Sequence, residues 1–182
     1  MAGGEDKDIL QLFADENTRN QSLSLLIEKY QKRLYWHIRK IVLSHDDTDD
    51  VLQNTFIKIW KGLENFKAES SLFTWMYRIA TNESLSFLRE KSRRNTTSIH
   101  PIEYEMGKSL EADPHFTGDA IQLKLQKAIL SLPEKQRIVF NLRYYEEMPY
   151  EQMSEVLETS VGALKASYHI AAKKVEEMLL ND

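Results

Sequence analysis

The chain has 182 residues, a formal net charge of −4 and no cysteine. This length allows one domain or two small ones, and the lack of cysteine excludes both a disulfide framework and a thiolate metal site. The negative net charge argues against a protein that coats DNA nonspecifically, so any affinity for nucleic acid must come from local basic faces. No signal-peptide core occurs at the N-terminus, and the apolar runs are far shorter than the roughly 20 residues of a membrane helix. We therefore expect a cytoplasmic protein.

Apolar residues recur at steps of three and four through the first half of the chain, which predicts amphipathic helices. The first apolar stripe runs from Leu23 to Ile41, the second from Val51 to Leu63 and the third from Leu72 to Leu88. Turn-forming residues separate the first two stripes, and a short break separates the last two. A basic cluster then ends this part of the chain, which we expect to be a helical bundle.

Residues 96–119 interrupt the helical pattern. They contain two prolines and two glycines and carry one lysine against five acidic residues, a composition typical of a flexible linker. Helical periodicity returns at Ala120 and breaks once, at Leu132 and Pro133. The sequence therefore predicts an all-α protein in which a flexible linker joins two small helical domains. The expected divisions are an N-terminal tail with the start of the first helix (1–20), a first domain (21–95), the linker (96–119) and a second domain (120–182).

The C-terminal end has the spacing of a helix-turn-helix unit. Residues 149–157 predict a short amphipathic helix, residues 158–160 a turn, and residues 161–179 a longer helix that Ser160 can cap. In such a unit the second helix enters the major groove of DNA. Four polar residues lie off the apolar face of this helix, where phosphates or base edges are within reach: Lys165, Ser167, His169 and Lys173. An ordinary helical hairpin with a solvated basic face has the same spacing, so the pattern leaves both interpretations open.

Two other segments combine residue types that suit interfaces. Residues 46–60 begin with four acids and present an outward row of polar side chains with one exposed apolar residue, as protein interfaces often do. Residues 66–94 place aromatic residues beside lysines and arginines, which suits single-stranded DNA because bases stack on rings while cations hold the backbone. The simpler alternatives are that the acids favour the start of a helix, that Trp75 is a core residue and that Arg78 is a solvated charge.

The sequence has no motif of a common enzyme class. It contains no Gly-rich phosphate loop, no HExxH or GxSxG motif and no paired metal-ligand spacing. The five histidines are scattered along the chain. We therefore expect no catalytic activity, no metal and no cofactor.

Four segments, in this order and spacing, resemble the extracytoplasmic-function sigma factors of the sigma-70 family. They are DDVLQNTFIKIW (49–60), FTWMYRIATN (73–82), LPEKQRIVF (132–140) and SVGALK (160–165). The resemblance covers nearly the whole chain outside the N-terminal tail and the linker. It implies an RNA polymerase sigma factor that binds core polymerase, recognises promoter DNA and promotes strand opening when transcription begins. The longer form SVGALKASYH is similar to the version found in Bacteroidetes members.

The resemblance also implies three sites. The first binds the beta-prime clamp of core RNA polymerase and consists of Asp49, Asp50, Gln53, Asn54 and Ile57. The second reads the minus-ten promoter element as the strands separate and consists of Phe66, Lys67, Ser71, Trp75, Arg78, Asn82 and Arg89. The third binds the minus-thirty-five element as duplex and consists of Ser160, Lys165, Ser167, Tyr168, His169 and Lys173.

The chain departs from the family pattern at three positions. Ser86 stands where many members carry aspartate, Ser167 where many carry arginine, and Glu158 replaces the common turn glycine. Recognition of the minus-thirty-five element would then rest on the other polar residues of the last helix. Members of the family are usually restrained by an anti-sigma factor that covers the polymerase and DNA surfaces, and we expect such a partner here.

Two other functions remain open from the residues alone. A dimeric helix-turn-helix transcriptional regulator that binds duplex operator DNA would explain the C-terminal half, and it predicts a stable dimer that binds DNA without polymerase. A helical adaptor without a DNA role predicts no salt-dependent affinity for DNA, whereas phosphate contacts weaken steeply with salt.

Overall fold

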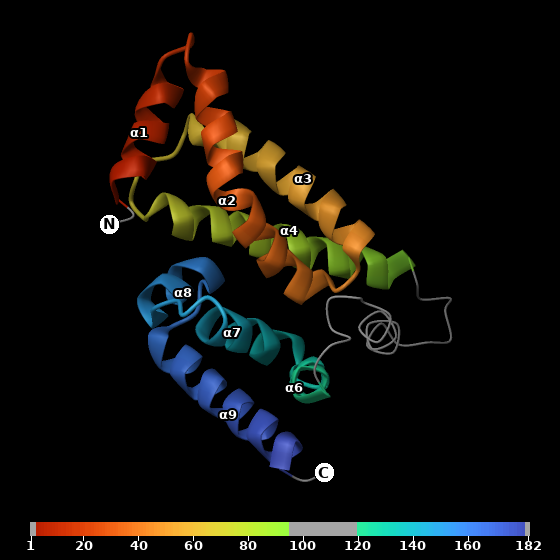
Figure 1. Ribbon diagram of the computed structural model, residues 1–182. Helices are drawn as coiled ribbons and strands as arrows, with labels where there is room; N and C mark the ends of the chain where they lie inside the picture. The colour runs from red at the N-terminus through yellow and green to blue at the C-terminus, as the bar shows by residue number, and fades with distance from the viewer. Residues whose placement is uncertain (1–2, 95–119, 181–182) are drawn as a thin grey trace.

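The computed structural model describes residues 3–94 and 120–180, and within these two segments all regular structure is helical (Figure 1). This confirms the expected all-α fold of two small helical domains, while the predicted linker lies outside the described residues. No helix of the described segments is long and apolar enough to traverse a lipid bilayer. The first domain contains α1 (Gly3–Ala14), α2 (Arg19–Val42), α3 (His45–Leu63) and α4 (Leu72–Arg94). The second contains α6 (Ala120–Leu130), α7 (Glu134–Tyr144), α8 (Tyr150–Leu157) and α9 (Val161–Leu180).

Residues with turn or capping geometry stand at several of the helix ends. Leu43 takes the left-handed conformation (φ 68) and ends α2. Ser44 then caps α3, because its hydroxyl oxygen accepts a hydrogen bond of 3.4 Å from the backbone nitrogen of Asp47. Pro133 stands directly before α7 and Pro149 directly before α8. Proline is tolerated at a helix start because the N–H group that it lacks would have no hydrogen-bond partner within the helix.

The core of the first domain lies between α2, α3 and α4. Its fully buried side chains include Leu34 from α2, Ile59 from α3 and Met76 from α4. His37 is also buried there, and one of its ring nitrogens lies 2.8 Å from the hydroxyl oxygen of Thr81. Burial lowers the pKa of His37 to about 4, so the imidazole is neutral near pH 7 and belongs to the packing.

The N-terminal helix α1 packs on this bundle. Its Ile9 and Phe13 are buried. The carboxylate of Asp6 accepts a hydrogen bond of 2.6 Å from the hydroxyl of Tyr30 and lies 2.9 Å from the ammonium nitrogen of Lys29. The first part of the predicted tail is therefore a helix that contributes to the core of the first domain.

The second domain has a smaller apolar cluster between α6, α7 and α9. Its buried members are Ala128, Ile129, Leu132, Phe140, Ala171 and Val175. The ring of Tyr168 lies against this cluster and stacks on Phe140, with 5.8 Å between the ring centroids. α9 is thereby held with one face toward α6 and α7, and it also packs on α8.

The two domains are in contact (Figure 1), because α8 packs on α4 and α7 packs on α2. The larger apolar cluster of the described residues runs across this contact. It contains Leu142, Met148 and Met153 of the second domain together with Met76 and Tyr77 of the first. The structure is thus a closed arrangement in which part of each domain's surface faces the other domain.

Candidate protein and nucleic-acid interfaces

The outer face of α3 carries the five residues that the family resemblance assigns to polymerase. Val51, Thr55 and Ile59 point into the core and are buried, so the positions between them face outward. All five predicted residues are exposed on that outward face: Asp49, Asp50, Gln53, Asn54 and Ile57. The structure therefore brings this predicted set together.

A shallow apolar groove of about 470 Å³ lies beside this face, between α2 and α3. Its apolar lining includes Leu23, Ile27 and Trp60, and Ile57 stands at the groove with 46% of its surface exposed. Asp49 and Gln53 add polar groups to the lining. An apolar groove with a polar border has the chemistry of a protein–protein interface.

A larger cavity of about 780 Å³ lies beside the first half of α4. It contains most of the residues that the resemblance assigns to the minus-ten element. Five of the seven line it: Phe66, Lys67, Trp75, Arg78 and Asn82. The cavity therefore combines two aromatic rings, two cations and an amide, which together can stack on a base, hold a phosphate and donate or accept hydrogen bonds.

The position of Trp75 in this cavity depends on Gly62. A β-carbon built on Gly62 would lie 2.9 Å from a carbon of the Trp75 indole ring, closer than real contacts allow. The indole also lies near Phe66, with 5.0 Å between the ring centroids. The absence of a side chain at residue 62 therefore lets the indole pack against the end of α3.

Ser71 has a structural role that the sequence did not reveal. It stands directly before α4, and its hydroxyl oxygen accepts a hydrogen bond of 3.0 Å from the backbone nitrogen of Thr74. This is the geometry of an N-cap, which satisfies one of the free N–H groups at a helix start. Ser71 does not line the cavity but is exposed near it and fixes where α4 begins.

Replacing Ser71 with alanine is expected to lower the free energy of unfolding by about 1 kcal/mol, because the cap is lost. Urea unfolding followed by circular dichroism measures this change. Ser71→Asp is the matched control, since a carboxylate can accept the same hydrogen bond and should preserve the stability. Equal stability of Ser71→Ala and the unsubstituted protein would contradict the capping role.

Arg89 is the other predicted residue outside the cavity. It is exposed and lies seven residues after Asn82 on α4. Because seven residues are close to two helical turns, both side chains leave the same face of α4. Arg89 thus extends the polar stripe of the cavity toward the C-terminal end of this helix.

The far wall of the cavity comes from the second domain. Ser154, Glu155 and Glu158, in α8 and directly after it, line the cavity opposite α4. A guanidinium nitrogen of Arg78 lies 3.0 Å from a carboxylate oxygen of Glu158. The sequence had not placed α8 at this site, and the only signal was the acidic residue at a turn that usually carries glycine. Glu158 indeed takes the left-handed conformation (φ 51), which is costly for a residue with a side chain.

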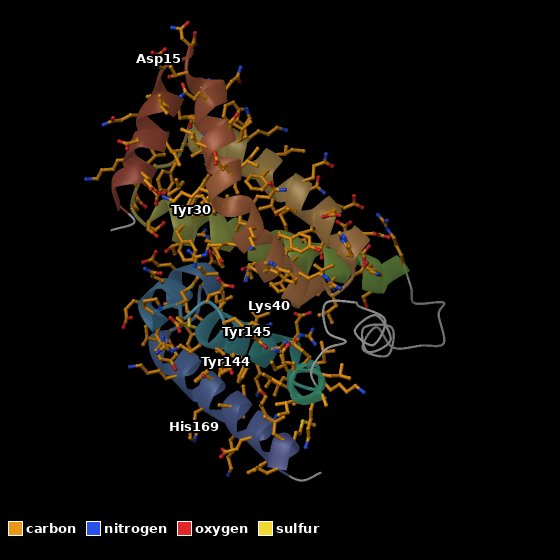
Figure 2. The ribbon with its side chains drawn as sticks, in the orientation of Figure 1. Asp15, Tyr30, Lys40, Tyr144, Tyr145 and His169 are labelled. Carbon is orange, nitrogen blue, oxygen red and sulfur yellow. The ribbon has the colours of Figure 1, made fainter. Side chains whose placement is uncertain are left out.

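The solvent-exposed face of α9 carries three of the predicted minus-thirty-five residues. Lys165, His169 and Lys173 are exposed at a spacing of four and so form one line along the helix. Figure 2 shows His169 on the outer side of α9, away from the first domain. Ser160 caps the helix, because its hydroxyl oxygen accepts a hydrogen bond of 3.3 Å from the backbone nitrogen of Ala163.

Two predicted residues of α9 are not on that exposed line. Ser167 is half-buried, and Tyr168 is half-buried with its ring stacked on Phe140. Burial raises the pKa of the Tyr168 phenol. The ring of Tyr168 is therefore part of the packing of the second domain.

The described parts of the chain contain no cluster of three or more acidic or histidine side chains placed to bind a metal ion.

Two protein-family models match the chain. The model described as "Sigma-70 region 2" matches residues 26–94, which cover most of the first domain. The model described as "Sigma-70, region 4" matches residues 122–175, which cover most of the second domain. The two matched ranges together make up more than half of the chain, and the boundary between them falls at the predicted linker.

Curated relatives are similar over nearly their whole length. The chain is 27% identical over 167 residues to the ECF RNA polymerase sigma-E factor of Haemophilus influenzae, and the match covers 87% of this chain and 88% of that protein. It is 29% identical over 167 residues to the RNA polymerase sigma-H factor of Pseudomonas aeruginosa, and that match covers 87% and 86%.

Two solved structures have a similar fold. One is the sigma factor RpoE in complex with the anti-sigma factor NepR from Bartonella quintana, with a TM-score of 0.69, 22% identity and coverage of 86% of this chain and 95% of that chain. The other is CnrH in complex with the cytosolic domain of CnrY, with a TM-score of 0.70, 20% identity and coverage of 97% and 98%.

Proposed function

We propose roles for the surfaces of the two domains from the premise that the chain belongs to the sigma-70 family and is an RNA polymerase sigma factor of the extracytoplasmic-function type. It binds core RNA polymerase, recognises promoter DNA and promotes strand opening at the start of transcription. The first domain is region 2 and the second is region 4.

The face of α3 that carries Asp49, Asp50, Gln53, Asn54 and Ile57 is the proposed binding site for the beta-prime clamp. It is supported by the exposure of all five side chains and by the apolar groove beside Ile57. Burial of exposed apolar surface on association provides the main favourable free energy, and the polar residues around it set the orientation.

The cavity beside α4 is the proposed site for a base of the minus-ten element. The observation that carries this proposal is the convergence of Phe66, Trp75, Arg78 and Asn82, with Lys67, on one cavity. A base that leaves the duplex loses stacking and pairing worth a few kcal/mol. Stacking on an aromatic ring contributes about 1–3 kcal/mol per base, so capture of an unpaired base offsets much of the cost of opening. Arg89 and Ser71 extend this site along α4 and at its start.

The exposed line of Lys165, His169 and Lys173 is the proposed contact with the minus-thirty-five element as duplex. It lies on the second helix of a helix-turn-helix unit, the helix that enters the major groove in such proteins. Ser160 acts first as the cap of that helix, which also presents free N–H groups to a phosphate. Ser167 and Tyr168 would contribute from the border of this surface.

The partners and setting follow from the same family membership. Both similar solved structures are complexes, one named as containing the anti-sigma factor NepR and the other the cytosolic domain of CnrY. We extend this to the present chain as the proposal that an anti-sigma factor binds it. We also propose that it acts in the cytoplasm with polymerase and has no catalytic activity of its own. An origin in Bacteroidetes stays a prediction from the form SVGALKASYH.

Run-off transcription tests the proposed function. Purified bacterial core polymerase is incubated with a pool of genomic promoter fragments, with and without the protein. Transcripts that appear only with the protein, and whose start sites share two upstream elements, are the expected result. Absence of both transcripts and co-elution with core polymerase, together with a stable dimer that binds duplex DNA, would instead favour the operator-binding regulator.

A further inference from the structure

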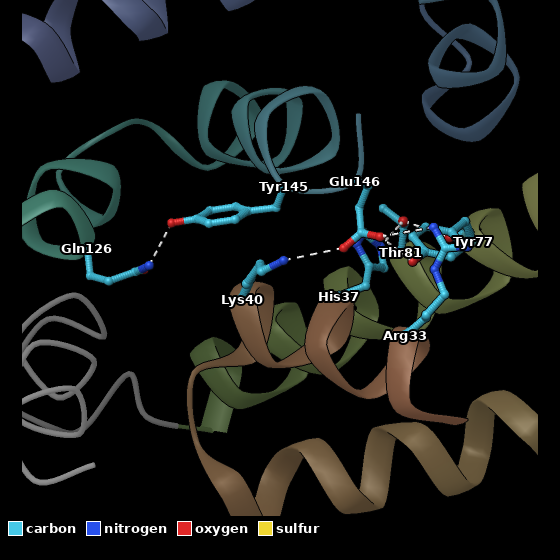
Figure 3. Close-up of polar contacts among 8 residues, drawn as sticks. All are labelled: Arg33, His37, Lys40, Tyr77, Thr81, Gln126, Tyr145 and Glu146. Atoms are coloured by element: carbon cyan, nitrogen blue, oxygen red, sulfur yellow. Dashed lines mark hydrogen bonds and ion pairs between the residues drawn. The ribbon is translucent and has the colours of Figure 1, made fainter. Parts of the chain in front are cut away.

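Glu146, in the loop between α7 and α8, is inserted between the two domains (Figure 3). One of its carboxylate oxygens accepts a hydrogen bond of 2.7 Å from the hydroxyl of Tyr77 on α4. The other accepts one of 3.3 Å from the ammonium nitrogen of Lys40 on α2. A guanidinium nitrogen of Arg33 lies 3.6 Å from the first oxygen. A single carboxylate of region 4 therefore meets three partners, all of which belong to region 2.

The environment of this carboxylate is largely shielded from water. The side chain of Glu146 is 10% exposed and that of Lys40 is 20% exposed. Burial raises the pKa of Glu146, but the Tyr77 hydrogen bond and the Lys40 charge outweigh it and leave the pKa below its ordinary value. A buried charge is tolerated only when it is paired and hydrogen-bonded. Separation of the domains would remove all three partners at once.

Aromatic contacts surround the same ion pair. The ammonium nitrogen of Lys40 lies 4.2 Å from the ring centroid of Tyr145, the residue before Glu146. The hydroxyl of Tyr145 accepts a hydrogen bond of 2.7 Å from the side-chain amide of Gln126 on α6. Tyr145 is thereby held in place by its own domain (Figure 3), and Lys40 of α2 fits between its ring and the carboxylate. The contact is specific in geometry as well as in charge.

The same closure places α8 over the proposed minus-ten cavity. Glu158 pairs with Arg78 at 3.0 Å, and Glu155 also lines the cavity. The carboxylate of Glu158 thus pairs with the Arg78 guanidinium, which would otherwise be available to a DNA phosphate. The minus-ten and minus-thirty-five elements lie about 25 base pairs apart, which is about 85 Å of duplex. Two domains that touch each other cannot lie on both elements.

We propose that Glu146 latches region 4 onto region 2 in the free protein, so that the sigma factor occludes its own minus-ten cavity until polymerase holds the domains apart. The inference deepens the proposed function and rests on it for the role of the cavity. The closed state reduces the apparent affinity for single-stranded promoter DNA by the fraction of molecules that are open. Weakening of the latch should therefore raise this affinity in the absence of polymerase.

Single-molecule FRET on the full-length chain tests the latch without DNA or polymerase. The chain has no native cysteine, so dyes can be attached through Glu28→Cys on α2 and Glu176→Cys on α9, both exposed positions. Glu146→Gln keeps the size of the side chain and removes its charge. We expect it to raise the ratio of open to closed molecules by about tenfold or more, because it weakens hydrogen bonds that involve charged groups.

Glu147→Gln is the matched control. Glu147 is the next residue, is exposed and has no hydrogen bond or ion pair within the described residues, so this variant should keep the distribution of the unsubstituted protein. Glu158→Gly is a second test, because it removes the pair with Arg78 and relieves the left-handed conformation. It should increase the open fraction without loss of region 4 stability. A closed fraction that neither Glu146→Gln nor Glu158→Gly changes, or its absence from the unsubstituted protein, would overturn the latch.

Binding of single-stranded DNA separates the latch from the function of the cavity. The probe is an oligonucleotide that carries the minus-ten sequence found by run-off transcription. A rise in affinity that matches the rise in open fraction supports both proposals. An open fraction that rises while the affinity stays constant supports the latch and contradicts the assignment of the cavity to minus-ten DNA.

Discussion

Replacing Ile57 with aspartate is expected to weaken the binding of core RNA polymerase by about 100-fold. Ile57 is exposed over 46% of its surface and stands beside the apolar groove between α2 and α3. Full burial of such a side chain contributes about 1.5–3 kcal/mol, and a carboxylate in its place must also be desolvated. A loss of about 2.7 kcal/mol corresponds to about 100-fold in the dissociation constant. The measurement is a fluorescence titration of labelled protein with core enzyme.

The control for this substitution is Leu25→Asp. Leu25 lies on α2, is 37% exposed and does not line the groove. Both variants place aspartate at an exposed helical position, so both should remain folded. Equal affinity of Ile57→Asp and Leu25→Asp for core polymerase would remove Ile57 from the clamp interface.

Reversal of the charge at Arg78 is expected to reduce promoter opening by about 30-fold or more while polymerase binding is retained. Arg78 lies at the cavity with half of its side chain exposed and is paired there with Glu158. A hydrogen bond from a charged group to DNA is worth about 1.5–3 kcal/mol, and Arg78→Glu adds repulsion from the phosphates. Permanganate reactivity of thymines in the minus-ten element measures the fraction of open complexes.

Lys32→Glu is the control for Arg78→Glu. Lys32 is an exposed cation on α2 and does not line the cavity, so its reversal changes the net charge equally without altering the proposed site. If the two variants reduce opening to the same extent, the effect is general electrostatics and Arg78 has no specific role. A specific loss in Arg78→Glu supports the cavity as the minus-ten site.

The closed arrangement links the two surfaces that these variants probe. Arg78 takes part in the proposed DNA site and in a contact with region 4, so Arg78→Glu should also weaken domain closure. The groove beside Ile57 is lined by α2 and α3 alone. Polymerase can therefore reach the proposed clamp-binding face of region 2 while the proposed minus-ten cavity is still covered, so we expect clamp binding to come before opening of the domains.

The helices and their ends followed from the sequence because their causes are local. Apolar residues at steps of three and four define which face of a helix is buried, and residues such as Ser44, Pro133 and Pro149 fix where helices start. The exposure of Ile57 on the outer face of α3 followed from the same periodicity. The family motifs identified both domains for a related reason, since each motif lies within one or two neighbouring helices.

The roles of two serines show how much of the structure local sequence patterns can predict. The resemblance assigned Ser71 and Ser160 to DNA, and in the structure both hydroxyls cap helices. The cap at Ser160 was predicted from the sequence, but the cap at Ser71 was not. Similarly, the expected N-terminal tail contains a helix whose Ile9 and Phe13 are buried. The sequence showed polar residues at helix starts and apolar residues near the N-terminus, but not which surface each would meet.

Only the tertiary structure decided how the domains face each other. Glu146 and Glu147 are identical neighbours in the sequence, yet the Glu146 side chain is 10% exposed among Arg33, Lys40 and Tyr77, while Glu147 is exposed. The partners of Glu146 lie 69 to 113 residues earlier in the chain. Contacts over such separations depend on the packing angles of whole helices, which periodicity does not encode. The sequence by itself determined the helices, the two domains and the family. The packing of α8 against α4 determined which charges are paired between the domains, because this pairing depends on how the surfaces of two separately folded domains fit together.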